Sequence, residues 1–216
     1  MNWSSDFAYA VGLITTDGNL SKDGRHLDFT SKDIEQIENF RRILKLTNKI
    51  GLKSSGFSNK RYFRVQFGNV KLYKFLLSIG LTPNKSKTMS KIVIPDRFFR
   101  DFLRGHLDGD GYNYSYWDPR WKSSFMLYTG FVSASLVHLE WLNSEIERLY
   151  KLKGRIKFGR RAYQLKFAKY ASVKLLAKIY YKKDLICLTR KRFKIEGALD
   201  IIRKEAGVLK LVNRLP

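Results

Sequence analysis

Two aspartates, each at the end of a similar short motif, are the residues of this chain best suited to chemistry. Asp17 closes an apolar run that starts at Ala10, and Asp110 closes one that starts at Leu103; a glycine directly follows each aspartate. Hard divalent cations such as Mg²⁺ take oxygen ligands, typically one or two carboxylates with waters and substrate phosphates. The two motifs therefore predict a divalent-cation site, provided that the fold brings both carboxylates together.

Small residues four positions apart in each motif indicate how the fold does this. Gly12 and Thr16 in the first motif, and Gly105 and Gly109 in the second, share one face of a helix. Small side chains on one face let two helix backbones approach closely. We expect the motif helices to pack side by side at Gly12 and Gly105, with the two aspartates together at their ends.

This placement of the two aspartates is electrostatically unfavourable without a cation. A helix C-terminus carries partial negative charge, and two neighbouring carboxylates raise each other's pKa. A bound divalent cation would relieve both penalties. The glycines that follow the aspartates, Gly18 and Gly111, are expected in the left-handed conformation that commonly ends a helix.

Composition points to a polyanionic partner, nucleic acid first. The chain has 216 residues and a net charge of +23, and 44% of it is hydrophobic, which is enough for a sizeable core. The single cysteine, Cys187, excludes an internal disulfide framework and a cysteine-rich zinc site. The sequence contains no recognisable signal peptide and no apolar run of membrane-spanning length. We therefore expect an intracellular protein, in a bacterial or archaeal cytoplasm or in an organelle.

The spacing of apolar residues predicts the same series of elements twice. After a first motif helix that begins near Ser4, we expect strands at 25–30, 50–53 and 62–67, the last two around a turn at Gly56 and Asn59, and helices at 33–46 and 69–79. A second motif helix opens at Pro95, with Asp96 as its N-cap. Strands at 112–118, 124–132, 154–159 and 162–168 and helices at 134–150, 170–181 and 190–212 follow.

The predicted fold is therefore α+β, with two αββαββα repeats at residues 1–94 and 95–216, the second with a C-terminal helical extension. Four antiparallel strands with one apolar face need helices on that face, which leaves the other face free. The free faces are basic in both halves, and the run from 153 to 169 contains no acid. Since a twisted antiparallel ribbon can enter a major groove and read base edges, we expect the two free faces to form a saddle on DNA. Ordinary solvated strand faces are the alternative.

The residues expected on this DNA-binding surface come from both halves. They are Lys22, His26, Asp28, Lys53, Arg61, Arg64, Gln66, Tyr114, Tyr116, Tyr128, Arg155, Lys157, Arg160, Arg161, Gln164 and Lys166.

The paired motifs resemble those of the LAGLIDADG homing endonucleases in their single-chain, two-repeat form. The second motif matches well from Gly105 to Gly111. The first agrees at Gly12-Leu13-Ile14 and at Asp17-Gly18, whereas Thr15 and Thr16 stand where the family usually has Asp-Ala. Together with the layout of the repeats, the resemblance covers roughly residues 5–195.

This resemblance implies a metal-dependent endonuclease of the kind that serves intron homing. It implies sequence-specific cleavage of both strands of a long double-stranded DNA site across the minor groove, by phosphodiester hydrolysis that leaves short 3′ overhangs. Asp17 and Asp110 would bind the metal, with the backbone carbonyls of Thr16 and Gly109 as further ligands. Mg²⁺ or another divalent cation such as Mn²⁺ is the expected cofactor, and Ca²⁺ is expected to support binding without cleavage. We expect a monomer.

Family members also place lysine or glutamine near each scissile phosphate. Lys32 is the candidate in the first repeat, and its counterpart in the second is Ala134, which would make the two sites unequal. The loop that holds Lys85 resembles a recurrent basic loop of the family, and the stretch with Lys191 matches it in the second repeat. We assign these three lysines to the active site; surface lysines that contact phosphate or nothing are the alternative for each.

The competing function is a DNA-binding regulator or an intron maturase that uses the same scaffold without cleavage. The presence of both motif acids favours the enzyme. Maturase activity would add RNA as a partner, and it leaves no readable mark in the sequence. Within the second motif, Asp108, which aligns with Thr15, is interpreted as structural through a hydrogen bond to nearby backbone, and His106 as a packed residue.

Overall fold

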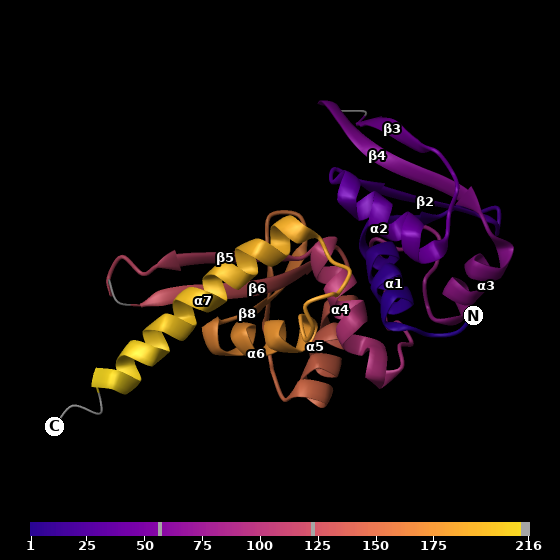
Figure 1. Ribbon diagram of the computed structural model, residues 1–216. Helices are drawn as coiled ribbons and strands as arrows, with labels where there is room; N and C mark the ends of the chain where they lie inside the picture. Colours follow the sequence, from indigo (N-terminus) through magenta and orange to yellow (C-terminus); the bar gives the residue numbers. More distant parts are fainter. Residues whose placement is uncertain (56–57, 122–123, 213–216) are drawn as a thin grey trace.

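Two four-stranded antiparallel sheets with the same strand order make up the β-structure of the computed structural model (Figure 1), which describes residues 1–55, 58–121 and 124–212. The first sheet has the order β1-β2-β4-β3, and the second has the order β5-β6-β8-β7. The strands are β1 Gly18–Leu20, β2 His26–Ser31, β3 Ile50–Ser55, β4 Ser58–Gly68, β5 Tyr112–Trp117, β6 Phe125–Ser133, β7 Arg155–Phe158 and β8 Tyr163–Phe167. The predicted α+β fold of two similar repeats is confirmed.

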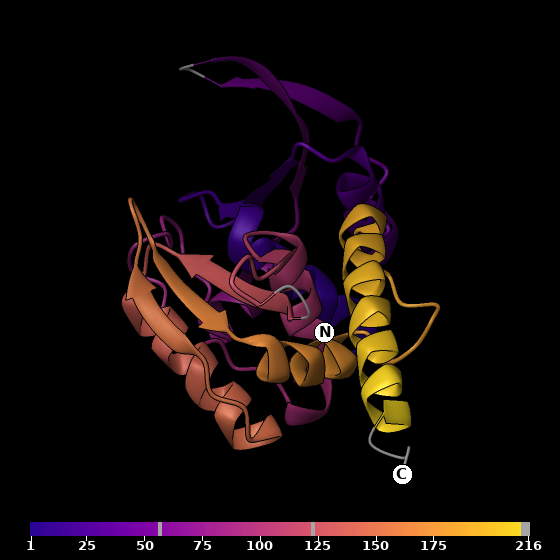
Figure 2. The ribbon, with the colours of Figure 1, turned by 90° about the vertical axis from the view of Figure 1, so that its left-hand side faces the viewer.

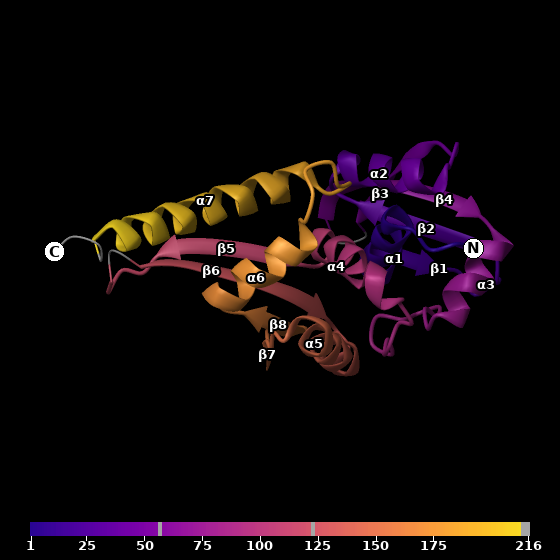
Figure 3. The same ribbon diagram turned by 60° about the horizontal axis from the view of Figure 1, so that its bottom comes forward.

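The helices also follow the predicted series. They are α1 Ser5–Asp17, α2 Ile34–Leu44, α3 Val70–Ser78, α4 Phe99–Asp108, α5 Leu136–Tyr150, α6 Lys169–Ile179 and α7 Thr189–Val212. Helices α2 and α3 pack on the first sheet, and α5 and α6 pack on the same face of the second (Figure 3). Figure 2 shows the pair β3 and β4 arching away from the rest of the chain.

Side chains of β2 alternate between the buried and the exposed face of the sheet, as the sequence predicts. Leu27 and Phe29 of β2 are buried against the helices, whereas His26 is exposed on the other face. The turn predicted near Gly56 lies outside the described residues, and Asn59, which was assigned to the same turn, belongs to β4.

Helices α1 and α4 cross at the two glycines, between the two sheets (Figure 1). A Cβ atom on Gly12 would lie 2.8 Å from the backbone nitrogen of His106, and one on Gly105 would lie 3.1 Å from the Cα atom of Gly12. Each Cβ would also collide with a backbone carbonyl oxygen of the facing helix, that of Phe102 for Gly12 and that of Tyr9 for Gly105, so glycine is required on both helices for the backbones to meet. The predicted close packing at Gly12 and Gly105 is confirmed.

Two details of the motif helices differ from the prediction. Gly18 has an extended backbone (φ −85°, ψ 153°) and Gly111 has no positive φ, so the expected left-handed ends are wrong. Steric crowding explains why both positions hold glycine. A Cβ on Gly18 would lie 2.7 Å from the Cα of Ile14, and one on Gly111 would lie 2.5 Å from the Cα of Leu107.

The second motif helix also begins later than predicted. A short 3-10 turn occupies Asp96–Phe98, and α4 starts at Phe99. Asp96 is not its N-cap; the carboxylate instead pairs with the guanidinium of Arg148 on α5, with 2.5 and 2.8 Å between the atoms. A bidentate ion pair with a residue distant in sequence thus takes the place of the local cap.

Helix α7 runs beside β5, the edge strand of the second sheet (Figures 1 and 3). Ile195 and Ala198 are buried on the side of α7 that faces the body. Glu205 fixes a later turn, because its carboxylate accepts from the backbone N–H of Phe125 (3.2 Å) and pairs with Lys169 (3.1 Å). The predicted C-terminal helix is confirmed. None of the helices in the described part of the chain combines the length and apolar character that a membrane crossing requires.

Candidate active site

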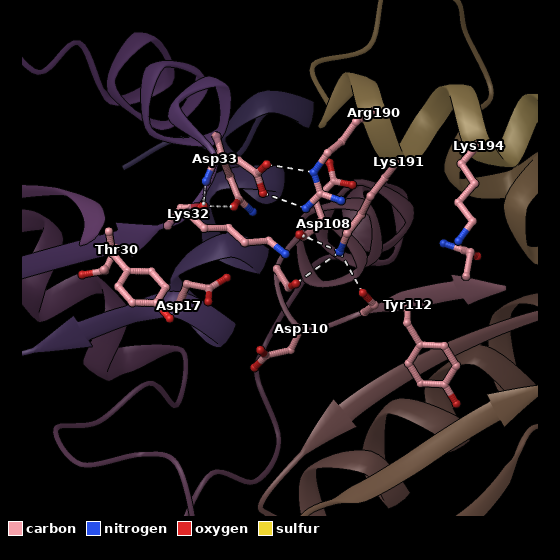
Figure 4. Close-up of a pocket in the computed structure, with 16 residues that line it drawn as sticks. Asp17, Thr30, Lys32, Asp33, Asp108, Asp110, Tyr112, Arg190, Lys191 and Lys194 are labelled. Atoms are coloured by element: carbon pink, nitrogen blue, oxygen red, sulfur yellow. Dashed lines mark hydrogen bonds and ion pairs between the residues drawn. The ribbon is translucent and has the colours of Figure 1, made fainter. Parts of the chain in front are cut away.

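The two motif aspartates open into one cavity of about 510 Å³, between the two repeats (Figure 4). Asp17 is the last residue of α1, and Asp110 lies two residues beyond the end of α4, just before β5. The carboxylate of Asp17 also lies against the second motif, since a Cβ on Gly109 would be 2.7 Å from its Oδ2. The fold thus brings together the two side chains that the sequence singled out.

Both carboxylates are held at an electrostatic cost. Burial raises the pKa of Asp17 to about 7, and the negative charge of Asp110 adds to this shift. Burial also raises the pKa of Asp110. The hydroxyl of Thr16 is 3.1 Å from Asp17 Oδ2, and its hydrogen bond opposes the shift. Two neighbouring acids with raised pKa values, Asp17 half-buried and Asp110 exposed at the mouth of the cavity, form the electrostatic environment that a bound cation would relieve.

Two lysines, the buried Lys85 and the half-buried Lys191, lie at the ends of the motif helices. Lys85 Nζ donates to the carbonyl of Gly18 at the end of α1 (2.5 Å). Lys191 Nζ lies 2.7–3.2 Å from the carbonyl oxygens at the end of α4, those of Leu107, Asp108, Gly109 and Gly111. Burial lowers the pKa of each lysine to about 8, and the carboxylates of Asp17 and Asp110 oppose that shift. The structure therefore places Lys85 and Lys191 beside both acids, in matching positions of the two repeats.

The large cavity contains further cations. Lys32 follows β2 and extends into the cavity toward the ammonium of Lys191, and Lys194 lines its other side (Figure 4). Arg190 also lines it, and donates two hydrogen bonds of 2.8 and 2.7 Å to the carboxylate of Asp33. Sequence reasoning missed the roles of Asp33, Arg190 and Lys194; for Lys194, the helical spacing from Lys191 was an available signal.

Asp110, but not Asp17, also lines a second, smaller cavity of about 130 Å³. Asp110, Lys85 and Ala134 line it, together with Thr16 and His106. Nε2 of His106 is 3.0 Å from Nε2 of His138, whose Nδ1 is 2.8 Å from the carbonyl of Ser90. Because a carbonyl only accepts, His138 carries its proton on Nδ1 and accepts from His106. His106 is thus a packed residue, as predicted.

Asp108 is buried and holds the two repeats together. Its carboxylate accepts from the hydroxyl of Tyr9 (2.9 Å) and from the backbone N–H of Leu188 (2.7 Å). Burial raises its pKa to about 6. The bond to Leu188 agrees with the structural role inferred from the sequence.

The donor set of the large cavity fits a hard divalent cation. Its acids offer only oxygen atoms, the type of ligand that such a cation prefers. Asp17 and Asp110 would therefore be the protein's charged ligands, and backbone carbonyls its neutral ones. The carbonyl of Gly109 accepts from Lys191 (3.2 Å), so this predicted ligand would have to exchange the ammonium for the cation.

On the first sheet, most residues expected to contact DNA share the face away from the helices. His26, Asp28, Lys53, Arg64 and Gln66 occupy alternate strand positions in register across this sheet, with Asp28 opposite Gln66. Asp28 is nearly buried and pairs with Arg64 (3.2 Å). Arg61 has the opposite alternation in β4 and does not share the face of Arg64; Lys22 lies in the turn between β1 and β2.

The corresponding face of the second sheet is aromatic. The rings of Tyr112, Tyr114 and Tyr116 stack in a row along β5, and the ring of Tyr128 from β6 stacks on that of Tyr114 (centroids 4.9 Å apart). Lys166 Nζ donates to the hydroxyl of Tyr114 (2.6 Å) and lies 4.0 Å from the ring centroid of Tyr128. The same face carries Arg155, Lys157 and Gln164, while Arg160 and Arg161 lie in the turn between β7 and β8.

Comparison with solved structures finds the same architecture. Full-length WhiA from Thermatoga maritima aligns over 99% of this chain and 67% of its own, with 13% identity and a TM-score of 0.60. The homing endonuclease I-WcaI bound to its DNA recognition sequence aligns over 90% of this chain and 87% of its own, with 17% identity and a TM-score of 0.61. The LAGLIDADG homing endonuclease I-GzeII in complex with a DNA target aligns over 99% and 94%, with 11% identity and a TM-score of 0.59.

No family model and no curated protein matches the sequence. The likeness in structure covers nearly the whole chain and both sheets, with the motif glycines at the crossing of α1 and α4. This protein therefore has the two-repeat LAGLIDADG fold.

Proposed function

We propose that this protein is a sequence-specific endonuclease that cleaves both strands of a long DNA site. One observation carries the proposal: Asp17 and Asp110 line one cavity at the junction of two basic repeats. The two sheet faces supply positive and hydrogen-bonding groups for the phosphates and bases of the DNA. DNA binding also agrees with the basic net charge and with the DNA-bound proteins that share the fold.

The residues of the cavity have distinct roles in this proposal. Asp17 and Asp110 would hold Mg²⁺ or Mn²⁺, with the carbonyls of Thr16 and Gly109 as neutral ligands. The cation would lower the pKa of the attacking water and stabilise the leaving 3′ oxygen. Lys85 and Lys191 lie beside the acids and would offset the negative charge of a scissile phosphate. With the two sites so close, cleavage across the minor groove would leave short 3′ overhangs, and Ca²⁺ would support binding alone.

A DNA-binding regulator or intron maturase without cleavage remains the second candidate. The contact between Lys191 and the Gly109 carbonyl favours it, because the ammonium already occupies one of the proposed metal ligands. WhiA, whose N-terminal domain is named a LAGLIDADG domain, matches this chain as closely as the homing endonucleases do. The fold is therefore not confined to proteins named as endonucleases, and it does not by itself decide for cleavage. The case for the enzyme depends on the pair of acids.

Two selections from one randomised duplex library test the proposal. The first recovers duplexes bound in Ca²⁺, and the second recovers ends produced in Mg²⁺. The endonuclease predicts that both selections converge on the same site and that the ends carry short 3′ overhangs. Convergence of the bound pool without any cleaved pool would identify a binding protein instead.

A further inference from the structure

The free faces of the two sheets, which the helices leave uncovered, can be compared position by position. Ser31 Oγ at the end of β2 accepts from the backbone N–H of Asp33 (3.1 Å), and Ser133 Oγ at the end of β6 accepts from that of Ser135 at the same distance. Both strands are also flanked in the same way, β2 by β1 and β4, and β6 by β5 and β8. These two strands are therefore equivalent, with Ser31 aligned to Ser133.

The aligned positions differ in chemistry. Polar side chains occupy the free face of β2, at His26, Asp28 and Thr30. Aromatic or apolar residues occupy the equivalent positions of β6, at Tyr128, Gly130 and Val132. The neighbouring strand repeats the contrast, because Asn19 of β1 lies opposite Asp28 and Tyr112 of β5 lies opposite Gly130. The second sheet thus presents what we call the tyrosine layer, the rings of Tyr112, Tyr114, Tyr116 and Tyr128.

The second sheet holds the tyrosine layer in place. The ring of Tyr112 lies across β6 above Gly130, where an added Cβ would be 2.6 Å from the Cε1 atom of the ring. Its hydroxyl donates to Oε1 of Gln164 on β8 (3.3 Å), and Nζ of Lys166 on the same strand donates to the hydroxyl of Tyr114 (2.6 Å). The polar side chains of β8 on this face therefore bind the rings, which fixes the layer on the sheet.

A layer of rings is suited to an apolar group on the DNA. In the major groove, the C5-methyl group of thymine is the apolar group at the edge of a base pair, whereas the other groups that distinguish the base pairs are hydrogen-bond donors or acceptors. Covering one such methyl removes it from water, which strengthens binding by about fourfold. By contrast, Gln66 on the free face of the first sheet carries an amide of the kind that pairs with adenine.

We propose that the half of the DNA site lying against β5 and β6 is rich in thymine and is recognised through its C5-methyl groups, while the half against the first sheet is recognised through hydrogen bonds. The inference rests on the proposed function, because it requires both sheets to lie in the major groove of a specific site. It adds to that function the base that the second repeat selects. Contact of the tyrosine hydroxyls with the DNA backbone alone is the competing interpretation.

Deoxyuridine separates the two interpretations, because it lacks the methyl group of thymidine and keeps the same hydrogen-bonding groups. The substrate is the duplex recovered by its binding in Ca²⁺, with each thymidine replaced in turn and the affinity measured by fluorescence anisotropy. Tyr116→Ser removes the most exposed ring of the tyrosine layer. Tyr170→Ser, which removes an exposed tyrosine of α6 on the helical side of the sheet, is the matched control.

In the wild type, each sensitive thymidine should lose about fourfold in affinity on replacement, and the sensitive positions should lie in one half of the site. Tyr116→Ser should abolish the penalty at the positions that its ring covers, while Tyr170→Ser keeps every penalty. A site that tolerates deoxyuridine throughout, penalties that fall equally on both halves, or penalties that Tyr116→Ser leaves unchanged would overturn the methyl readout and leave the endonuclease intact.

Cleavage of the unmodified duplex in Mg²⁺ is measured separately. A bound duplex that stays uncut would refute the endonuclease alone, because the affinities would still decide the methyl readout. Failure to recover any bound duplex would refute both.

Discussion

The carboxylate of Asp108 accepts a hydrogen bond from the backbone N–H of Leu188, with 2.7 Å between the two atoms. This bond joins the second motif helix to the segment that leads into α7, three residues before Lys191. It therefore helps to set the position from which the ammonium of Lys191 reaches the end of α4. Asp108 lines the larger cavity, but its carboxylate is bound to Tyr9 and Leu188. This acid of the motif therefore acts on the site by positioning Lys191.

Replacing this carboxylate should affect cleavage more than DNA binding. Asp108→Ala leaves the N–H of Leu188 and the hydroxyl of Tyr9 without their buried acceptor, which should lower the free energy of unfolding by about 2 kcal/mol. Asp108→Asn keeps one acceptor oxygen for Leu188 and should retain most of the cleavage rate. Thermal unfolding, anisotropy and cleavage assays on both variants test this. Equal losses of cleavage in the two variants would argue against a positioning role.

The crossing of α1 and α4 gives a second prediction. Gly105→Ala would place a Cβ against the carbonyl oxygen of Tyr9 and 3.1 Å from the Cα of Gly12, so the helices must separate. We expect the free energy of unfolding to fall by about 2 kcal/mol, a typical cost of overpacking, together with a loss of cleavage. Gly197→Ala on α7 is the matched control, because its Cβ would meet no atom within 4 Å. If urea unfolding finds Gly105→Ala as stable as this control, the crossing is looser than the structure indicates.

The buried histidine pair should make stability depend on pH. Burial lowers the pKa of His138 to about 4, and that of His106 falls well below its usual range. Below about pH 6.5 the two rings therefore bind protons in the unfolded chain but stay neutral in the folded chain. The free energy of unfolding falls as the pH drops from there toward 4. Asp17 and Asp108, with raised pKa values, act in the opposite direction.

A variant isolates the contribution of one ring from these opposing groups. His106→Leu places in the second motif helix the residue type that Leu13 provides in the first. Between pH 7 and pH 5, the wild type should lose about 2 kcal/mol more unfolding free energy than this variant does. Parallel pH curves for the wild type and His106→Leu would show that the ring is not held neutral.

DNA affinity should fall steeply with salt concentration, because each phosphate contact releases counterions. Lys53→Ala and Lys157→Ala each remove an exposed cation from a sheet face and should reduce the slope of log affinity against log salt by about 1. Lys178→Ala, on the helical side of the second sheet, should leave it unchanged. Anisotropy titrations at several salt concentrations measure the slope. A wild-type slope near zero would exclude the sheet faces as the docking surface.

Local pattern was enough to predict most of the fold. Alternation at Leu27 and Phe29 identified a strand with one buried face, and the small residues Gly12 and Gly105 identified the helix crossing, because both signals lie within a few residues of sequence. The acid pair followed from that crossing. The same reasoning failed where space rather than backbone conformation selects the residue, as at Gly18 and Gly111.

Long-range pairs were beyond the reach of the sequence pattern. Asp96 pairs with Arg148 rather than with the nearest helix end, and Asp33 pairs with Arg190, more than 150 positions later. No local signal connects such partners, because each carboxylate has several basic residues within reach in a chain of net charge +23. The sequence showed that Ala134 is the counterpart of Lys32 in the second repeat. It did not show that Arg190 and Lys194 also line the larger cavity.

The central claim is that Asp17 and Asp110 form one cation-dependent centre that breaks DNA. The most direct measurement compares Asp17→Asn and Asp110→Asn with the wild type on the selected duplex, for cleavage in Mg²⁺ and for affinity in Ca²⁺. Asp6→Asn, an exposed acid of α1, is the control. We predict that both variants lose double-strand cleavage by about 100-fold or more while their affinity stays within about threefold of the wild type. Cleavage of both strands at the wild-type rate by either variant would contradict this account.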